Sequence, residues 1–180
     1  DLLKRAGYDK VLNTTQVYTV WAPLNGTYDY AELAATDSAT LLREFIKNHV
    51  TRYNYPASGS IKENIYLLNN KLQNFVGDNT YTFGGVNVRT PNLASSNGVI
   101  HTIEGKVNFF SNLYEYLNKR KYAIDSISDY VHKFDVKILD TENSVVGPTV
   151  NGEITYLDSV FLESNALYSR LNRAYINRED

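Results

Sequence analysis

The sequence predicts an α+β fold, in which helices and β-hairpins occupy separate stretches of the chain. The first observation is a helical repeat of six residues on one face: Leu41, Leu42, Phe45, Ile46, His49 and Val50. The second is a pair of dipeptides, Gly84-Gly85 and Asn97-Gly98, that each separate two β-rich runs, as two-residue hairpin loops do. Because the hairpins follow one another without intervening helices, the order indicates α+β rather than βαβ alternation.

The N-terminal elements follow from local pattern. Residues 1–12 ("DLLKRAGYDKVL") predict a helix in which Gly7 is either a C-cap or an interruption. Residues 17–23 ("VYTVWAP") predict a strand that ends at a proline. Residues 24–38 have the composition of loop and turn, and the helix that follows takes Asp37 or Ser38 as its N-cap.

The middle of the chain predicts short strands. "NIYLLNN" (64–70) and "KLQNFV" (71–76) are separated by asparagines, and the two hairpins follow. A type I′ turn requires positive φ at both central residues, so we expect Asn97 to have φ above zero. The run after this turn contains His101, with Val99 and Ile103 on its side of the strand. Residues 112–119 ("NLYEYLNK") return to helical spacing.

The C-terminal part predicts a helix at 124–134, strands at 135–139 and 153–162, a turn at "VVGPTVNGE" (145–153), and a final helix over 165–180. The final helix is similar to the opening one: both combine an apolar pair, a basic residue, Arg-Ala and an aromatic residue. We therefore expect a domain at 1–119, and at 120–180 a connecting segment that leads into a second copy of the domain beyond Asp180.

Composition excludes several classes of site. A formal net charge of −2 gives no electrostatic reason to expect nucleic acid as a partner. The absence of cysteine excludes disulfides, thiolate zinc sites and cysteine nucleophiles. No apolar run approaches the roughly 18 residues that span a bilayer. The 15 tyrosines and 20 asparagines favour either strands or a wet binding surface.

The motifs of catalysis and cofactor binding do not occur in the sequence. Its three histidines lack H-x-x-x-H or H-x-H spacing, and no G-x-S-x-G elbow, phosphate loop, dinucleotide fingerprint or calcium loop is present. We predict no catalytic, metal or cofactor-binding residue. A buried neutral imidazole needs one donor and one acceptor partner, and we predict this structural role for His101.

Three motifs, in this order, resemble the fasciclin-like domain over residues 1–117. They are "TVWAPLN" (19–25), the His49-Val50 pair at the end of the long helix, and "NGVIHTIE" (97–104). Trp21 and Leu24 depart from the Phe and Thr usual in that family. The resemblance implies a twisted β-sandwich or wedge with helices packed against it. It also implies that the motif residues are structural: Thr19, Pro23, Asn25, His49, Asn97, Gly98 and His101.

The resemblance implies a non-catalytic adhesion or interaction module, outside the cell or on a bacterial cell surface, outer-membrane anchored or periplasmic. A lipid-anchoring cysteine would precede Asp1. No short integrin-contact sequence is present. The alternative is a carbohydrate-binding accessory protein of a surface glycan-uptake system, with exposed Tyr and Asn contacting sugars. An enzyme is the least favoured interpretation. The partner, protein or glycan, is not identified by the sequence.

Overall fold

The computed structural model of the chain describes residues 1–112, 115–117 and 125–165. The chain forms two compact units, Asp1–Phe109 and Phe110–Asp180. The boundary predicted between residues 119 and 120 falls outside the described residues, as does most of the helix predicted at 112–119; its residues 115–117 are helical. Within the described residues, no helix is long and apolar enough to cross a membrane.

The first unit is built on a seven-stranded sheet in the order β2-β1-β7-β6-β5-β4-β3. The strands are β1 (Tyr18–Pro23), β2 (Val50–Arg52), β3 (Ile61–Tyr66), β4 (Leu72–Asp78), β5 (Thr80–Phe83), β6 (Val86–Ser95) and β7 (Gly98–Ile103). The β1–β7 pair is parallel and the other pairs are antiparallel.

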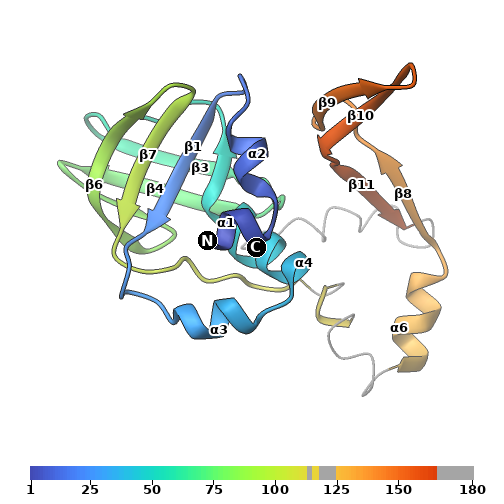
Figure 1. Ribbon diagram of the computed structural model, residues 1–180. Helices are drawn as coiled ribbons and strands as arrows, with labels where there is room; N and C mark the ends of the chain where they lie inside the picture. The colour runs from blue at the N-terminus through green and yellow to red at the C-terminus, as the bar shows by residue number, and fades with distance from the viewer. Residues whose placement is uncertain (113–114, 118–124, 166–180) are drawn as a thin grey trace. The chain divides into compact units, whose positions relative to one another are not determined.

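The sheet curls on itself, so that β3 and β4 pass behind β1 and β7 (Figure 1). The Leu68 amide donates to the Val50 carbonyl at 2.9 Å, and the Thr51 hydroxyl donates to the Tyr66 carbonyl. These bonds join the β2 edge to the end of β3, which nearly closes the sheet. Short helices beside a nearly closed, wedge-like sheet confirm the predicted α+β class and the predicted wedge with helices packed against it.

Short helices pack beside this sheet (Figure 1). They are α1 (Leu2–Arg5), α2 (Tyr8–Leu12), α3 (Tyr30–Ala35) and a continuous helical segment made of α4 (Ser38–Thr40), η1 (Leu41–Ile46) and η2 (Lys47–His49). Gly7, at φ +69°, separates the first two, so the prediction of an interruption there is confirmed. The helical segment begins as predicted at Asp37, whose carboxylate accepts from the Thr40 amide at 2.9 Å.

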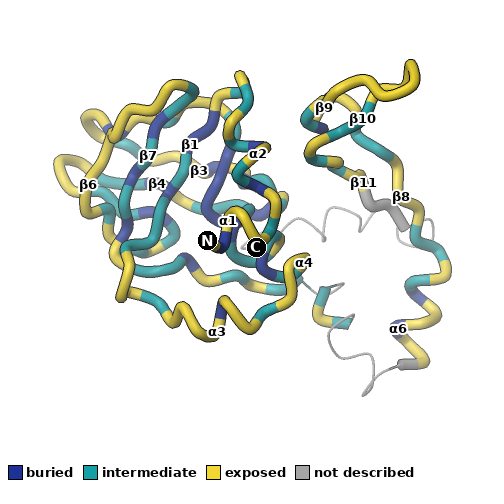
Figure 2. The backbone as a smooth tube through the Cα atoms, in the orientation of Figure 1, coloured by how far each residue is buried: buried dark blue, intermediate teal, exposed yellow. Residues whose placement is uncertain are grey.

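The core of the unit lies inside the curled sheet, where the buried residues of facing strands meet (Figure 2). One cluster of this core contains eight buried residues: Trp21, Ala57, Ile65, Leu67, Phe75, Phe83, Ile103 and Val107. Trp21 has no exposed surface and stacks on Phe83 with ring centroids 3.9 Å apart. Burial of a large apolar side chain contributes roughly 1.5–3 kcal/mol, so each of these two rings is a substantial part of the core.

Three predictions for local structure in the first unit are wrong. Val50, predicted on the apolar face of the long helix, begins β2 instead, because the helical segment ends at His49. Residues 30–35, predicted as loop, form α3, because Asp29 caps it by accepting from the Glu32 amide at 3.0 Å. The second hairpin exists, but Ser95 pairs with Gly98, so its loop is Ser96-Asn97 and Asn97 does not have positive φ. The Gly84-Gly85 hairpin is confirmed, with φ of 54° and 79°.

The second unit contains α6 (Asp125–His132), β8 (Asp135–Leu139), β9 (Val145–Val150), β10 (Glu153–Asp158) and β11 (Phe161–Asn165). β9 pairs with β10, and β8 with β11. The helix and β8 follow the prediction. The strand predicted over 153–162 is instead two strands, β10 and β11, which pair with different partners, and β9 was predicted as a turn. The turn is restricted to Asn151-Gly152, with φ of 53° and 83°. The helix predicted over 165–180 lies outside the described residues.

Candidate functional site

Thr19 of the first motif holds a loop that lies 34 residues further along the chain. Its buried hydroxyl donates to the Tyr53 carbonyl at 2.8 Å and accepts from the Tyr55 amide at 3.0 Å. One hydroxyl therefore satisfies a backbone acceptor and a backbone donor that would otherwise be buried without partners. The β1 strand positions this hydroxyl because Thr19 pairs with Thr51 and Val99 in the middle of the sheet.

His101 of β7 contacts the same loop. Its Nε2 lies 2.9 Å from the Tyr55 carbonyl oxygen, and its Nδ1 accepts from the Asn92 amide at 3.3 Å. These partners require the neutral tautomer with the proton on Nε2. Burial lowers the pKa of His101, although the Tyr55 carbonyl opposes this shift. The imidazole therefore has a donor partner and an acceptor partner, and both are backbone groups.

Asn97 and Gly98 lie at the start of β7, where the chain passes the end of α2. The side-chain amide nitrogen of Asn97 (Nδ2) donates to the backbone carbonyl oxygens of Leu12, Thr14 and Gln16, at 2.8, 2.9 and 3.2 Å. This contact, rather than the conformation of a type I′ turn, accounts for asparagine at position 97. At Gly98 a Cβ atom would lie 1.8 Å from the Tyr18 carbonyl oxygen, so the β1–β7 contact requires glycine.

The remaining residues of the first motif lie at the opposite end of β1. Pro23 pairs in register with Ile103, and the Leu24 amide donates to the Ile103 carbonyl at 2.9 Å. Asn25 is exposed in the turn that follows. The structure thus brings Thr19 and His101 to one loop, places Asn97 and Gly98 at one end of β7, and places Pro23 and Asn25 at the other.

His49 occupies a separate position at the end of the helical segment. Its Nδ1 lies 2.7 Å from the Phe45 carbonyl oxygen, and its Nε2 accepts from the Val107 amide at 2.8 Å. Burial lowers the pKa of His49 to about 4; the Phe45 carbonyl raises it and the Lys106 charge lowers it further. Adjacent Asn48, also buried, donates to the Val107 carbonyl at 3.2 Å.

A hollow of about 240 Å³ lies beside the His49–Val107 contact. Its lining comes from α3, the helical segment and the strand exit at 106–109, and includes buried Leu33, Leu41 and Val107. The charged lining residues are paired: Lys106 contacts Glu32 at 3.1 Å, and Glu44 contacts Arg43 at 2.6 Å. The hollow has a largely polar lining whose two carboxylates are both engaged in ion pairs.

The structure shows no metal-binding arrangement within its described residues, since no three His, Asp or Glu side chains there converge.

Reasoning from the sequence missed two structural asparagines. Asn92 bonds both the amide and the carbonyl of Ala57, at 2.8 and 2.7 Å, and Asn48 holds residues 107–108. The high asparagine content was the available signal, but it does not say which asparagines are engaged.

Comparison with known proteins identifies the family. The fasciclin domain model matches residues 1–106, which is more than half of the chain. A solved FAS1 domain pair from the insect cell adhesion molecule fasciclin I is similar at 16% identity and a TM-score of 0.46, over 73% of this chain. The chain spans about half, 52%, of that structure. No curated protein matches the chain. By the match to the family model, the chain belongs to the fasciclin domain family.

Proposed function

We propose that this chain is a non-catalytic adhesion or interaction module of a cell-surface or extracellular protein. Fasciclin domains are adhesion and interaction modules, and the match over residues 1–106 carries the proposal. The hydrogen bonds of the two buried histidines also support the proposal. In both His49 and His101 the two ring nitrogens bond backbone groups, so neither lone pair faces a substrate.

The proposal includes location and organisation. We place the module outside the cell, either outer-membrane anchored through a lipid upstream of Asp1 or periplasmic. The domain occupies residues 1–119, and residues 120–180 connect it to a second fasciclin domain. A cysteine-free chain with a nearly neutral net charge of −2 is compatible with an oxidising compartment and with uncharged partners.

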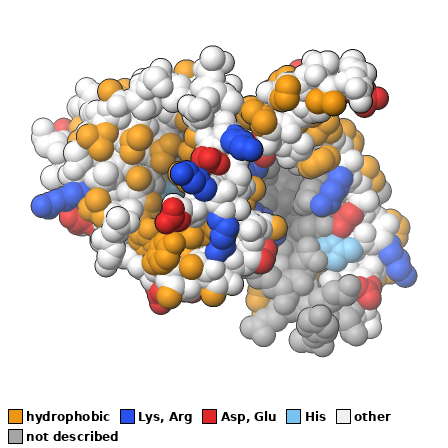
Figure 3. Space-filling view, viewed as in Figure 1, with side chains coloured by type: hydrophobic (Ala, Val, Ile, Leu, Met, Phe, Trp, Pro, Cys, Tyr) orange, Lys and Arg blue, Asp and Glu red, His pale blue; other side chains and the backbone are white. Residues whose placement is uncertain are grey.

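The surface offers contacts of mixed character. Figure 3 shows separate basic and acidic side chains on the visible face, without a broad field of one charge, and hydrophobic side chains that are partly scattered and partly grouped. Specific recognition on such a surface comes from individual aromatic and polar side chains rather than from electrostatic attraction. We therefore expect binding that changes little with ionic strength.

Adhesion can be measured directly. Beads coated with the 180-residue chain are mixed with cells of the species that encodes it, and retained cells are counted against albumin-coated beads. We expect specific retention. Retention no greater than that on albumin would contradict the proposed function.

The alternative is a carbohydrate-binding accessory role in glycan uptake. Three exposed tyrosines of the first unit favour it: Tyr30, Tyr53 and Tyr66 are 51%, 69% and 60% exposed, and such rings can stack on sugars. A glycan array separates the two functions. Saturable binding to a defined sugar supports the alternative, whereas adhesion without array binding supports a protein partner.

A further inference from the structure

Tyr53 has an unusual backbone conformation for a large residue. Its φ is +72°, and the other non-glycine residues with positive φ in the described chain are all asparagines: Asn70, Asn79, Asn92 and Asn151. Asparagine tolerates the left-handed region, but an aromatic side chain there is strained. The strain is not offset by burial of the ring, because Tyr53 is 69% exposed.

Side chains on three strands, two of them buried (Thr19 and His101), hold Tyr53 and the loop that follows it in this conformation. Thr19 of β1 bonds the Tyr53 carbonyl and the Tyr55 amide, His101 of β7 bonds the Tyr55 carbonyl, and Asn92 of β6 bonds both backbone groups of Ala57. The Tyr81 hydroxyl fixes the far end through the Gly59 carbonyl at 3.0 Å. Strain persists where surrounding contacts over-determine a conformation, and such residues cluster at functional sites.

We name residues 53–60, "YNYPASGS", the Tyr53 loop. The loop has no charged residue, and six of its eight residues are exposed: Tyr53, Asn54, Pro56, Ser58, Gly59 and Ser60. Tyr, Asn, Ser and Gly also dominate antibody binding loops, because Tyr supplies rigid contact area and the small polar residues supply adaptable hydrogen bonds. A fixed backbone lowers the entropy lost when such a loop binds.

We propose that the Tyr53 loop binds a protein partner and that the Tyr53 ring is its anchor; this rests on the proposed function. An exposed ring must be covered by the partner, which therefore supplies the pocket. The hollow of the unit is lined by residues from 32 to 45 and from 106 to 109, so it contains none of the loop. Because small ligands bind in concave sites, a projecting ring favours a folded protein with an apolar pocket and an uncharged rim.

The sharpest test is Tyr53→Gly, which removes the ring and also relieves the left-handed backbone. We expect Tm to rise by about 3 °C and bead retention of cells to fall at least about tenfold. A rise in stability combined with a loss of adhesion separates a binding role from a structural one. Tyr53→Phe keeps the ring and should retain most of the adhesion. Tyr30→Ala, which removes another exposed ring, is the matched control and should leave retention unchanged.

Two further measurements define the partner. Retention should change less than about twofold between about 50 and about 500 mM NaCl, because the loop is uncharged. Stripping the cells with protease should abolish retention, whereas periodate oxidation of their glycans should not; the reverse pattern would overturn a protein partner.

Three outcomes would overturn the role of the loop. The first is retention by Tyr53→Gly equal to that of the unchanged chain, which would leave the proposed function intact. The second is a fall in Tm for Tyr53→Gly, because Tyr53 would then be structural. The third is a failure of the unchanged chain to retain cells, which would contradict both the proposed function and the role of the loop.

Discussion

His49 and His101 are both buried and neutral, but they carry their proton on opposite ring nitrogens. His49 directs Nδ1 to the carbonyl of Phe45, one turn back in its own helix, and accepts at Nε2 from Val107, 58 residues away. His101 directs Nε2 to the carbonyl of Tyr55, 46 residues away, and accepts at Nδ1 from Asn92 on the neighbouring strand. Each ring joins one nearby backbone group to one distant one.

The difference lies in what each histidine holds in place. His49 fixes the exit from β7 beside the hollow, whereas His101 fixes the loop that presents Tyr53. In both rings, protonation would remove the acceptor of a backbone amide, because an imidazolium ring has no lone pair to offer. The same chemistry therefore supports two different surfaces of the unit, and removing either ring should show how independent they are.

The largest effect is expected for His101→Ala. The substitution leaves the Tyr55 carbonyl and the Asn92 backbone amide without their partner. It also removes a ring whose centroid lies 5.7 Å from that of Trp21 and 5.4 Å from that of Phe75. We expect the free energy of unfolding to fall by about 3–4 kcal/mol. Urea denaturation at neutral pH measures it, and a loss below about 1 kcal/mol would show that His101 does not support the loop.

Acidification should also lower the free energy of unfolding, without any mutation, because both buried histidines become protonated. The pKa of His49 is about 4 in the folded protein against 6.5 in the unfolded chain, so the unfolded chain binds more protons between these values. Stability is complete above about pH 6.5 and falls by about 3 kcal/mol as the pH drops to 4. His101, whose pKa is also lowered, contributes in the same direction.

The control for acidification is His49→Gln, which does not titrate. Its stability should change less between pH 6.5 and 4 than that of the unchanged chain, measured by denaturation at several pH values. An identical pH dependence in the two proteins would show that His49 is not the titrating group.

Asn97→Ala tests a third contact, which is half-buried and cannot titrate. It removes the amide that bonds the carbonyls of Leu12, Thr14 and Gln16. We expect a loss of about 2 kcal/mol, equal at pH 7 and pH 5. A loss that grew on acidification would mean that the contacts at the two ends of β7 are coupled.

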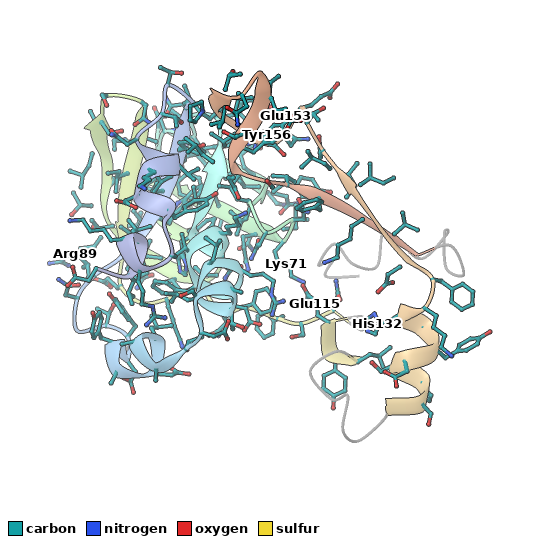
Figure 4. The ribbon with its side chains drawn as sticks, turned by 45° about the vertical axis from the view of Figure 1, so that its right-hand side comes forward. Lys71, Arg89, Glu115, His132, Glu153 and Tyr156 are labelled. Atoms are coloured by element: carbon teal, nitrogen blue, oxygen red, sulfur yellow. The ribbon has the colours of Figure 1, made fainter. Side chains whose placement is uncertain are left out.

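The smallest effect is expected for Arg89→Ala. Arg89 points outward from β6 (Figure 4), and its guanidinium lies 3.5 Å from the Glu104 carboxylate, with side chains 69% and 39% exposed. Exposed ion pairs contribute little, so we expect a change below about 0.5 kcal/mol. A larger loss in thermal denaturation would indicate that β6 depends on this pair.

The sequence predicted those elements whose signal is local. The Gly84-Gly85 hairpin and the Asp37-capped helical segment both follow from a few adjacent residues. Helix α3 had such a signal as well, in the Asp29-x-x-Glu32 spacing, but the surrounding glycine and tyrosines obscured it. In β9, Gly147-Pro148 resembles a turn, although proline is tolerated in a two-stranded ribbon because each strand there is an edge.

The Asn-Gly dipeptides show the limit of local inference. Asn151-Gly152 adopts positive φ at both positions, as a type I′ turn requires, whereas Asn97-Gly98 does not. What distinguishes Asn97 is its contact with residues 12–16, more than 80 residues away. The Thr19–Tyr53 and His101–Tyr55 contacts also join residues far apart in the sequence, across 34 and 46 residues. The family motifs indicated which side chains are structural, but their partners depend on the tertiary fold.

The parallel pairing of β1 with β7 has a consequence for how the domain forms. Strand β1 can pair with its parallel neighbour β7 only when a segment about 80 residues later in the chain is available. The Asn97–Gln16 contact spans a similar 81 residues. Such long-range closure slows folding and prolongs exposure of apolar surface. While the chain is being synthesised, β1 can pair with β2 and Trp21 can meet Phe83, but β1 lacks its parallel neighbour until β7 has emerged. We therefore expect closure of the sheet to be a late step in folding.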